Sequence, residues 1–251
     1  MQLPKALLAV LASRPRLAIL TGAGVSAESG IPTFREAQSG LWARFSPQEL
    51  ATPEAFSENP QRVWDWYRWR RELVQQGQPN AAHISIAELQ VKLNHCAIVT
   101  QNVDGLQQRA GATQVTELHG NLWRQRCVAE CGHIATIEAA VVVETGELPH
   151  CPQCGELLRP DVVWFGETLP DQAMAEAAYA IKTADMVLVC GTSNIVYPAA
   201  SLPLEALRLG KIVVEINPEK TPLSAKANYF LKAPASLVLP LLSNYLVKPS
   251  T

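Results

Sequence analysis

The chain has 251 residues, enough to bury a substantial core as one large domain or as a domain with a smaller insertion. With 48% hydrophobic and 18% charged residues, its composition is that of a soluble globular protein, not of a disordered or membrane one. The net charge of −2 gives no bulk electrostatic reason to bind nucleic acid. Since no apolar run approaches the roughly 18 residues of a membrane span, we expect a cytoplasmic protein without membrane contact.

The first apolar run, Ala6 to Ala12, resembles part of a signal peptide. It is short and stops at Ser13-Arg14-Pro15-Arg16 without a small-residue cleavage pattern. We therefore expect an amphipathic first helix.

The next run, Leu17 to Leu20, predicts a buried strand that ends in the pattern G-x-G-x-x-A of Gly22, Gly24 and Ala27. Gly22 allows a tight strand-to-helix turn, Gly24 lets the backbone lie close to a ligand, and Ala27 lets a helix pack closely on the strand. The free N–H groups of that helix would face an anion. An ordinary glycine turn is the alternative. No strand-like run with an acidic end follows at roughly 20 residues, as a dinucleotide fold requires, so other segments must complete a nucleotide site.

Residues 40–78 look helical and aromatic, and the turn at Ser57-Glu-Asn-Pro60 predicts a helix over Arg62–Gln75. Tyr67 and Arg70 lie three residues apart and so share one face of that helix. A solvated Arg beside a packing Tyr is the alternative interpretation.

From residue 80 onward, short apolar strands alternate with helices, which argues for a parallel sheet with helices on both faces. The expected helices cover 80–93, 171–183 and 198–209, and the expected strands cover 96–100, 114–118, 158–167, 186–190 and 211–216.

Polar or glycine residues follow four of the buried strands, at the edge where open α/β sheets bind ligands. They are Gly22 and Gly24, then Gln101, Asn102 and Asp104, then Gly191 and Ser193, and finally Asn217. We expect one crevice that holds a whole dinucleotide, with Asn217 in the role of the missing acidic residue. At Asn102 and Asp104 a helix cap is the alternative. His119, after the strand at 114–118, is by itself more often a structural than a catalytic residue.

Two cysteine pairs, Cys127-x3-Cys131 and Cys151-x2-Cys154, predict a closed structural zinc site of four thiolates. Disulfides are the alternative, which a cytoplasmic location argues against. His133 and His150 flank the pairs and are left out because four thiolates fill the site. Cys96 and Cys190 fall in predicted buried strands and look like small core residues.

The string Gly22-Ala-Gly-Val-Ser-Ala-Glu-Ser-Gly-Ile-Pro-Thr-Phe-Arg35 closely resembles the signature of the sirtuins, NAD-dependent protein-lysine deacylases. Further blocks match in the same order over most of the chain: Gln101-Asn-Val-Asp104, His119-Gly120, the four cysteines, Val163-Trp-Phe-Gly-Glu167, Gly191-Thr-Ser193 and Asn217. Three features depart from the pattern. Thr33 stands where many members have Asp, and Gln107-Gln108 stands where members commonly carry a His. The first cysteine pair has x3 spacing where many members have x2.

The resemblance implies that NAD is a co-substrate and that acylated lysines in peptides and proteins are the partners. NAD loses nicotinamide, the acyl oxygen attacks the exposed ribose carbon, and His119 acts as general base, with free lysine and an O-acyl-ADP-ribose as products. Asn102 and Asp104 would position the ribose and nicotinamide. The implied cofactor-binding set is Gly22, Ala23, Gly24, Glu28, Phe34, Arg35, Gln101, Asn102, Val103, Asp104, Gly191, Thr192, Ser193, Asn217 and Ala235. Val163, Trp164, Phe165 and Gly166 would form the lysine tunnel.

One branch of the family prefers succinyl- and malonyl-lysine, and the string from Val63 to Glu72 looks like that of its members. By this resemblance Arg70 supplies a bidentate fork for a carboxylate, the Tyr67 hydroxyl adds a donor, and Ala51 widens the acyl pocket.

The resemblance also gives the expected domains. A Rossmann-like NAD-binding domain takes residues 1–35, 80–122 and 160–251, and a helical module (36–79) with a zinc-ribbon module (123–159) forms a smaller domain. A monomer is expected. The remaining alternatives are a nicotinamide dehydrogenase and a non-catalytic binding module built on NAD or on the zinc ribbon.

Overall fold

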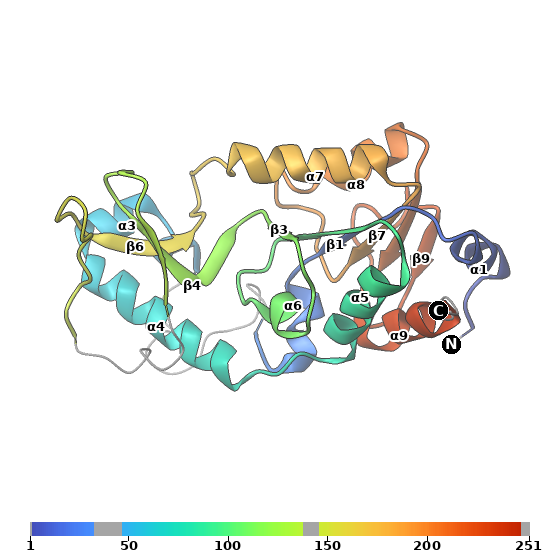
Figure 1. Ribbon diagram of the computed structural model, residues 1–251, viewed down its shortest axis with the longest axis horizontal. Helices are drawn as coiled ribbons and strands as arrows, with labels where there is room; N and C mark the ends of the chain where they lie inside the picture. The colour runs from blue at the N-terminus through green and yellow to red at the C-terminus, as the bar shows by residue number, and fades with distance from the viewer. Residues whose placement is uncertain (1, 33–46, 138–145, 247–251) are drawn as a thin grey trace.

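A computed structural model of the chain describes residues 2–32, 47–137 and 146–246. The expected α/β architecture is confirmed. A six-stranded parallel sheet forms the larger part of the molecule, and a three-stranded antiparallel sheet forms the smaller part (Figure 1).

The large sheet has the strand order β3-β2-β1-β7-β8-β9, and every neighbouring pair is parallel. The chain steps outward from β1 to β3 and later returns beside β1 with β7, so the strand order reverses between β1 and β7. Such a switch point is where open α/β sheets bind ligands. The strands are β1 (Leu17–Thr21), β2 (Cys96–Thr100), β3 (Val115–Glu117), β7 (Met186–Cys190), β8 (Ile212–Ile216) and β9 (Tyr229–Leu231).

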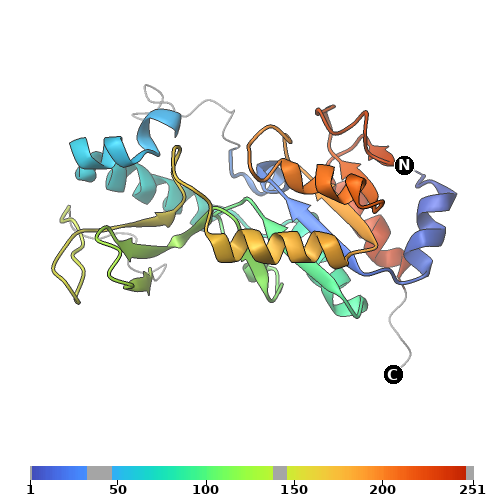
Figure 2. The same ribbon diagram turned by 90° about the horizontal axis from the view of Figure 1, so that it is seen from above.

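Alternate residues of these strands enter two separate cores, because successive side chains point to opposite faces of a sheet. Ile19 and Leu188 pack with α1 (Lys5–Ala12), α5 (Ala81–Lys92) and α9 (Ala235–Tyr245). Leu20 and Val187 pack on the other face, with α7 (Asp171–Thr183) and α8 (Ser201–Arg208), which lie side by side in Figure 2. Burial on both faces explains why these strands are continuous apolar runs in the sequence.

The small sheet has the order β5-β4-β6 and shares one core with three helices. The long helix of this group begins at a capping turn, where Asn59 Oδ1 accepts a hydrogen bond from Arg62 N at 2.9 Å and Pro60 is the first helical residue. Figure 1 shows this helix running beneath β4 and β6. The elements are α2 (Pro47–Leu50), α3 (Pro53–Glu58), α4 (Pro60–Gln76), β4 (Gly120–Cys127), β5 (Ile134–Thr136) and β6 (Leu158–Val162).

The domain boundaries expected at 122/123 and 159/160 fall inside β4 and β6, because β4 begins at Gly120 and β6 continues to Val162. The division of the chain into an NAD-binding domain and a small domain stays a prediction.

One local expectation was wrong at the end of β1. In place of an α-helix, two short 3-10 helices follow, η1 (Ala23–Val25) and η2 (Ala27–Ser29), and Ala27 is exposed and does not pack on the strand. Gly30 ends η2 in the left-handed region at φ +79°, and Pro32 follows two residues later, so the segment cannot continue as a helix.

Two further differences concern the second half of the chain. The strand expected over 158–167 ends at Val162, and Gly166 adopts φ +88° in the turn that follows. No element was predicted beyond residue 216, where β9 and α9 lie. β9 is only three residues long, and Pro240 inside α9 weakens the helical pattern.

None of the helices within 2–32, 47–137 and 146–246 combines the length and the apolar character needed to cross a membrane.

Candidate active site

The carboxyl ends of four neighbouring strands meet at one edge of the large sheet, as the sequence predicts. Thr21, the last residue of β1, is in register with Thr100 of β2 and with Cys190 of β7, and Cys190 is in register with Ile216 of β8. The residues that follow these strands therefore lie side by side at the switch point.

Gly22 and Gly24 allow the turns after β1 and β7 to touch. A Cβ atom on Gly22 would lie 2.8 Å from Thr192 Cα, and one on Gly24 would lie 2.8 Å from Gly191 O. Gly24 N donates to Gly191 O at 2.8 Å. The glycines are thus required for packing between two turns, in addition to the close ligand approach expected at Gly24, which is exposed.

Thr192 connects the ends of three strands. Its Oγ1 accepts a hydrogen bond from Gln101 Nε2 at 3.1 Å, and its carbonyl accepts one from Asn217 Nδ2 at 2.8 Å. Ala23 and Ser193 lie half-buried on the turns beside it. These contacts bring together the residues expected to hold a dinucleotide.

Ser26 is the centre of a buried polar network at the same edge. Its hydroxyl donates to Asp104 Oδ2 at 2.7 Å and accepts from Asn102 Nδ2 at 3.2 Å, while Asn102 Nδ2 also donates to Gly22 O at 3.1 Å. Asp104 Oδ1 accepts from Leu106 N at 2.8 Å, so the capping interaction at the start of α6 (Leu106–Arg109) is present as well. Burial raises the pKa of Asp104, opposed by these hydrogen bonds and by the positive charges of Arg70 and Arg109.

His83 completes this network and was not a candidate in the sequence. Its Nδ1 accepts a hydrogen bond from Asn80 N at 3.2 Å, and because a backbone N–H only donates, Nδ1 carries no proton. The proton therefore sits on Nε2, which donates to Ser26 Oγ at 3.3 Å. Burial lowers the pKa of His83 to about 4, so the ring is neutral. The capping-box spacing of Asn80 and His83 in the sequence could have predicted the orientation of the His83 ring. It could not have predicted the contact of His83 with Ser26.

His119 lies half-buried next to these strand ends. Its Nδ1 is 2.9 Å from Gln101 O, and since a carbonyl only accepts, Nδ1 carries the proton and Nε2 keeps its lone pair. Burial lowers the pKa of His119, partly offset by the hydrogen bond to Gln101. The imidazole is therefore neutral at pH 7 with Nε2 able to accept a proton.

The segment Val163–Gly166 lies between the two parts of the molecule. Val163 N donates to His119 O at 3.0 Å, and Phe165 N donates to Ala51 O at 2.8 Å. Trp164 is buried against Phe56, with ring centroids 5.3 Å apart, whereas Phe165 is 43% exposed. The segment thus joins the His119 region to the helical part that carries Ala51.

Tyr67 and Arg70 lie beside Trp164. Trp164 Nε1 donates to the hydroxyl of the fully buried Tyr67 at 2.9 Å, and the Arg70 guanidinium carbon lies 5.7 Å from the centroid of the Tyr67 ring. Burial raises the pKa of Tyr67 and lowers that of Arg70, and the positive charge of Arg70 acts on Asp104. Arg70 therefore lies close enough to the strand-end network for its charge to act on Asp104.

The other expected site residues are distributed more widely. Glu28 is exposed on η2, Val103 is buried with its carbonyl accepting from Leu122 N at 2.8 Å, and Ala235 is the buried first residue of α9. Phe34 and Arg35 lie outside the described residues.

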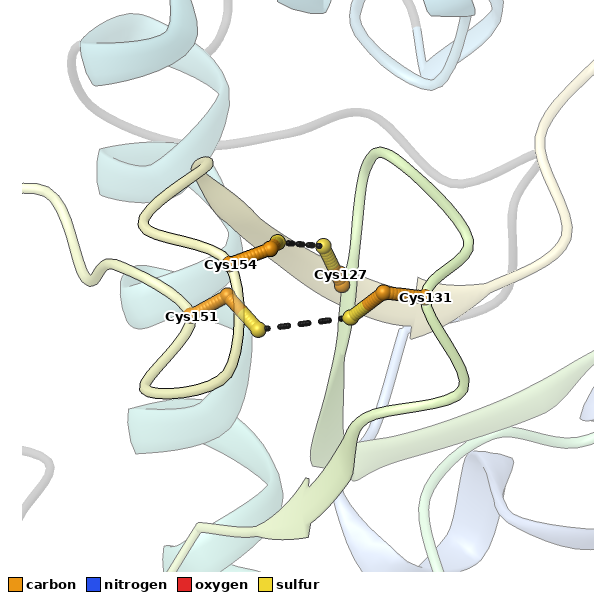
Figure 3. Close-up of side chains that lie close together, drawn as sticks. All are labelled: Cys127, Cys131, Cys151 and Cys154. Carbon is orange, nitrogen blue, oxygen red and sulfur yellow. Dashed lines mark hydrogen bonds between the residues drawn. The ribbon is translucent and has the colours of Figure 1, made fainter.

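The four expected cysteines form one cluster, in which all four sulfur atoms lie within 4.8 Å of one another. Figure 3 shows them pointing toward a common centre. Cys127 Sγ lies 3.4 Å from Cys154 Sγ, and Cys131 Sγ lies 3.5 Å from Cys151 Sγ. A tetrahedral site with zinc–sulfur bonds of about 2.3 Å requires sulfur–sulfur distances of roughly 3.8 Å. The backbone N–H groups of Gln153 and Glu156 donate to the sulfurs of Cys151 and Cys154, which suits thiolate ligands. The donor set and geometry fit a structural zinc ion.

Comparison with known proteins agrees with this geometry. Residues 22–198 match the Sir2 family. The NAD-dependent protein deacylase of Ralstonia nicotianae is 52% identical over 225 residues, which cover 90% of this chain and 89% of that protein.

Two solved structures share the fold. A Sir2 homologue in complex with NAD is 45% identical, with a TM-score of 0.91 over 98% of this chain and 94% of that one. A Sir2 protein in complex with a p53 peptide and NAD+ is 32% identical, with a TM-score of 0.82 over 97% of this chain and 98% of that one. The chain belongs to the Sir2 family.

Proposed function

We propose that this protein uses NAD to remove acyl groups from protein lysines, with a preference for the dicarboxylic succinyl and malonyl groups, and that it releases nicotinamide and an O-acyl-ADP-ribose. Membership in the Sir2 family makes it an NAD-dependent protein deacylase. The acyl preference and the products are the finer part of the proposal. The observation that carries the preference is the set of hydrogen-bond donors around the Tyr67 hydroxyl.

The turns at the strand ends suit a dinucleotide. The glycine turn after β1 leaves the backbone of Gly24 exposed, and Thr192 is hydrogen-bonded to Gln101 and to Asn217 beside it. We assign the NAD contacts to Gly22, Ala23, Gly24, Glu28, Gln101, Asn102, Val103, Asp104, Gly191, Thr192, Ser193, Asn217 and Ala235, with Phe34 and Arg35 from outside the described residues. When bound, NAD supplies the ADP-ribosyl group that receives the acyl oxygen as nicotinamide leaves.

His119 is the proposed general base. Its Nδ1–H is fixed on Gln101 O, which leaves Nε2 to take a proton from a ribose hydroxyl. Asn102 and Asp104 are held through Ser26, and we assign them the positioning of the ribose and the nicotinamide. The general base thus needs no change of tautomer to act.

The proposed acyl preference rests on the hydrogen-bond donors that gather at the Tyr67 hydroxyl. The indole N–H of Trp164 only donates, so the Tyr67 oxygen accepts, and the Tyr67 hydrogen needs an acceptor elsewhere. Arg70, which also forms a hydrogen bond with Tyr67, has no acceptor atom to offer. A carboxylate at the acyl end provides one, through charge-assisted hydrogen bonds of roughly 1.5–3 kcal/mol each. An acetyl group does not.

The remaining proposed contacts are with the lysine and the metal. Val163, Trp164, Phe165 and Gly166 would form the lysine tunnel, with Ala51 at its acyl end. Cys127, Cys131, Cys151 and Cys154 would hold zinc, which contributes folding energy and takes no part in the reaction. Acylated lysine peptides and proteins are the proposed partners. The monomeric state and the cytoplasmic location stay predictions.

The test is an assay with NAD and three peptides that differ only in an acetyl, malonyl or succinyl group on one lysine. We expect one nicotinamide released per lysine deacylated and a higher kcat/KM for the two dicarboxylic groups. Formation of NADH would favour a nicotinamide dehydrogenase instead. Binding of NAD without any turnover would favour a non-catalytic module.

A further inference from the structure

A cluster of charged side chains lies where the chain passes from the large sheet into the small one. Arg124 of β4 donates from Nη1 to Glu117 Oε2 of β3 at 2.6 Å and from Nε to Asp161 Oδ2 of β6 at 2.7 Å. The side chains of Glu117 and Asp161 are only 11% and 15% exposed, and that of Arg124 is 35% exposed. One guanidinium therefore joins three strands that belong to two sheets.

The same cluster extends to α6. Glu117 Oε1 accepts hydrogen bonds from Asn121 Nδ2 at 2.5 Å and from Gln108 Nε2 at 2.7 Å. Glu117 thus contacts α6 of the larger part and β4 of the smaller part with one carboxylate. A relative movement of the two sheets must stretch these bonds.

In the sequence, His119 lies between Glu117 of this cluster and Gly120, the first residue of β4. Leu118 N donates to Thr100 O of the large sheet at 2.9 Å, and His119 O accepts from Val163 N, just after β6, at 3.0 Å. Gly120 adopts φ +78°, and a Cβ atom there would lie 2.1 Å from Asp161 O, so β6 passes directly against this turn. Figure 1 shows β3 leading into β4 at this junction.

We propose that Arg124 is a positioning residue that holds Glu117 and Asp161 together and thereby fixes the place of His119 between the two sheets. The planar guanidinium presents its donors in a rigid fork, so it sets the distance and the angle between the two carboxylates. Nε2 of His119 must reach a proton within hydrogen-bond distance, and a displacement of about 1 Å in such a contact can cost about 100-fold in rate. Arg124 touches no substrate and acts only through His119. The proposal therefore rests on the proposed role of His119 as general base.

The first test is the kinetics of Arg124→Gln with succinyl peptide and NAD. We expect kcat to fall about 10-fold or more with KM for NAD changed less than about twofold, because the NAD contacts lie on the large sheet. Arg124→Lys keeps one charge but loses the fork, so its kcat should lie between those of wild type and Arg124→Gln. The matched control is Arg208→Gln, which breaks an exposed Arg208–Glu205 pair of 2.6 Å on α8 and should leave kcat unchanged.

The second test follows the His119 imidazole directly by NMR titration, with His119→Gln used to assign its signal. If Arg124 holds His119 in its half-buried place, Arg124→Gln should raise the pKa of His119 toward the usual value near 6.5. A role in stability alone would lower the melting temperature and leave kcat of the folded enzyme and this titration unchanged, which would overturn the proposal.

If Arg124→Gln does not fold, Asp161→Asn and Arg124→Lys serve for both measurements with the same expected directions. An active His119→Gln variant would instead refute the general-base role of His119 in the proposed function. An inactive His119→Gln together with normal kcat and titration in the Arg124 variants would refute only this inference.

Discussion

In the large sheet, all residues of β1 and β7 are buried, and all but Thr21 are apolar, whereas β4 of the small sheet carries two partly exposed arginines, Arg124 and Arg126. The cores differ in the same way. The large sheet packs aliphatic side chains on both faces, while the small part packs aromatic rings against guanidinium groups and two of the four clustered cysteines. Hydrophobic burial stabilises both regions, and in the second the cysteine cluster and cation–π contacts add to it.

Two arginines show what the small part requires. Arg159 lies over the Trp164 ring at 3.3 Å and pairs with both carboxylate oxygens of Glu167. Arg71 is 2% exposed and lies 5.2 Å from the Trp64 ring, and burial lowers its pKa to about 10. Buried charges of this kind cost free energy unless other interactions compensate. The small part therefore needs polar and cation–π contacts that compensate these charges, in addition to its hydrophobic core.

Removal of the metal should have the greatest effect, because the two regions should then unfold at different temperatures. Structural zinc in small zinc modules contributes an apparent folding free energy of about 10–16 kcal/mol. We expect a strong chelator, or Cys151→Ser, to remove zinc and to unfold the β4–β6 region at a lower temperature than the rest, as followed by calorimetry and metal analysis. Cys96→Ser, outside the cluster, is the control and should keep zinc. An unchanged melting profile in Cys151→Ser would refute a structural role for the cluster.

The second effect concerns His119, at the junction of the regions. His119→Ala should lower turnover by roughly 10²–10⁴-fold, the usual range for loss of a general base, with melting and NAD binding nearly intact. The measurement is kcat together with NAD affinity by calorimetry. His95→Ala, which changes an exposed His, should behave like wild type. Near-normal turnover of His119→Ala would remove it from the mechanism.

The third effect is a loss of folding stability at low pH that comes from His83 in α5, which packs on the large sheet. The pKa of His83 is about 4 in the folded protein and near 6.5 when unfolded, so the unfolded state binds a proton first as pH falls. The contribution of neutral His83 to the free energy of unfolding is therefore complete above pH 6.5. It falls by about 3 kcal/mol between pH 6.5 and 4. Denaturant unfolding of wild type and His83→Gln at several pH values measures it. The variant should lose less stability over that interval, and an equal loss in both proteins would contradict the burial of a neutral His83.

The smallest effect concerns Tyr67 and Arg70 of α4, the residues proposed to bind the acyl group. Arg70→Met should lower kcat/KM on succinyl peptide by about 10- to 200-fold and change it on acetyl peptide by less than about threefold. Tyr67→Phe should also lower kcat/KM more on the succinyl than on the acetyl peptide, but it removes the acceptor of Trp164 Nε1 as well, so both peptides should lose some activity. Equal losses on both peptides would mean that the pair supports α4 and not the acyl group.

The contrast between the regions also explains what the sequence could predict. The strand Cys96–Thr100 and the helix Asp171–Thr183 were predicted with their observed bounds, because buried parallel strands are continuous apolar runs and helices repeat at 3.6 residues. The four strand ends and the cysteine cluster followed from topology and spacing. β9 and α9 were missed, one because it is very short and the other because it contains Pro240.

The candidate site was predictable only where its residues follow strands. Ser26 and His83 are 57 positions apart in the chain, so no local pattern indicates that they share a hydrogen bond. The Trp164–Tyr67 contact spans 97 positions and likewise depends on how the small part packs. Such contacts come from tertiary structure, which a spacing rule cannot supply.

Competition between two peptides in one reaction tests the preference of the protein for dicarboxylic acyl groups. Wild-type protein is incubated with NAD and equal amounts of a succinyl and an acetyl peptide of the same sequence, and both are followed by mass spectrometry. The ratio of initial consumption rates equals the ratio of the two kcat/KM values. We expect faster consumption of the succinyl peptide by the wild-type protein, and a reversal or equalisation of the ratio in Arg70→Met. Faster consumption of the acetyl peptide by the wild-type protein would contradict it.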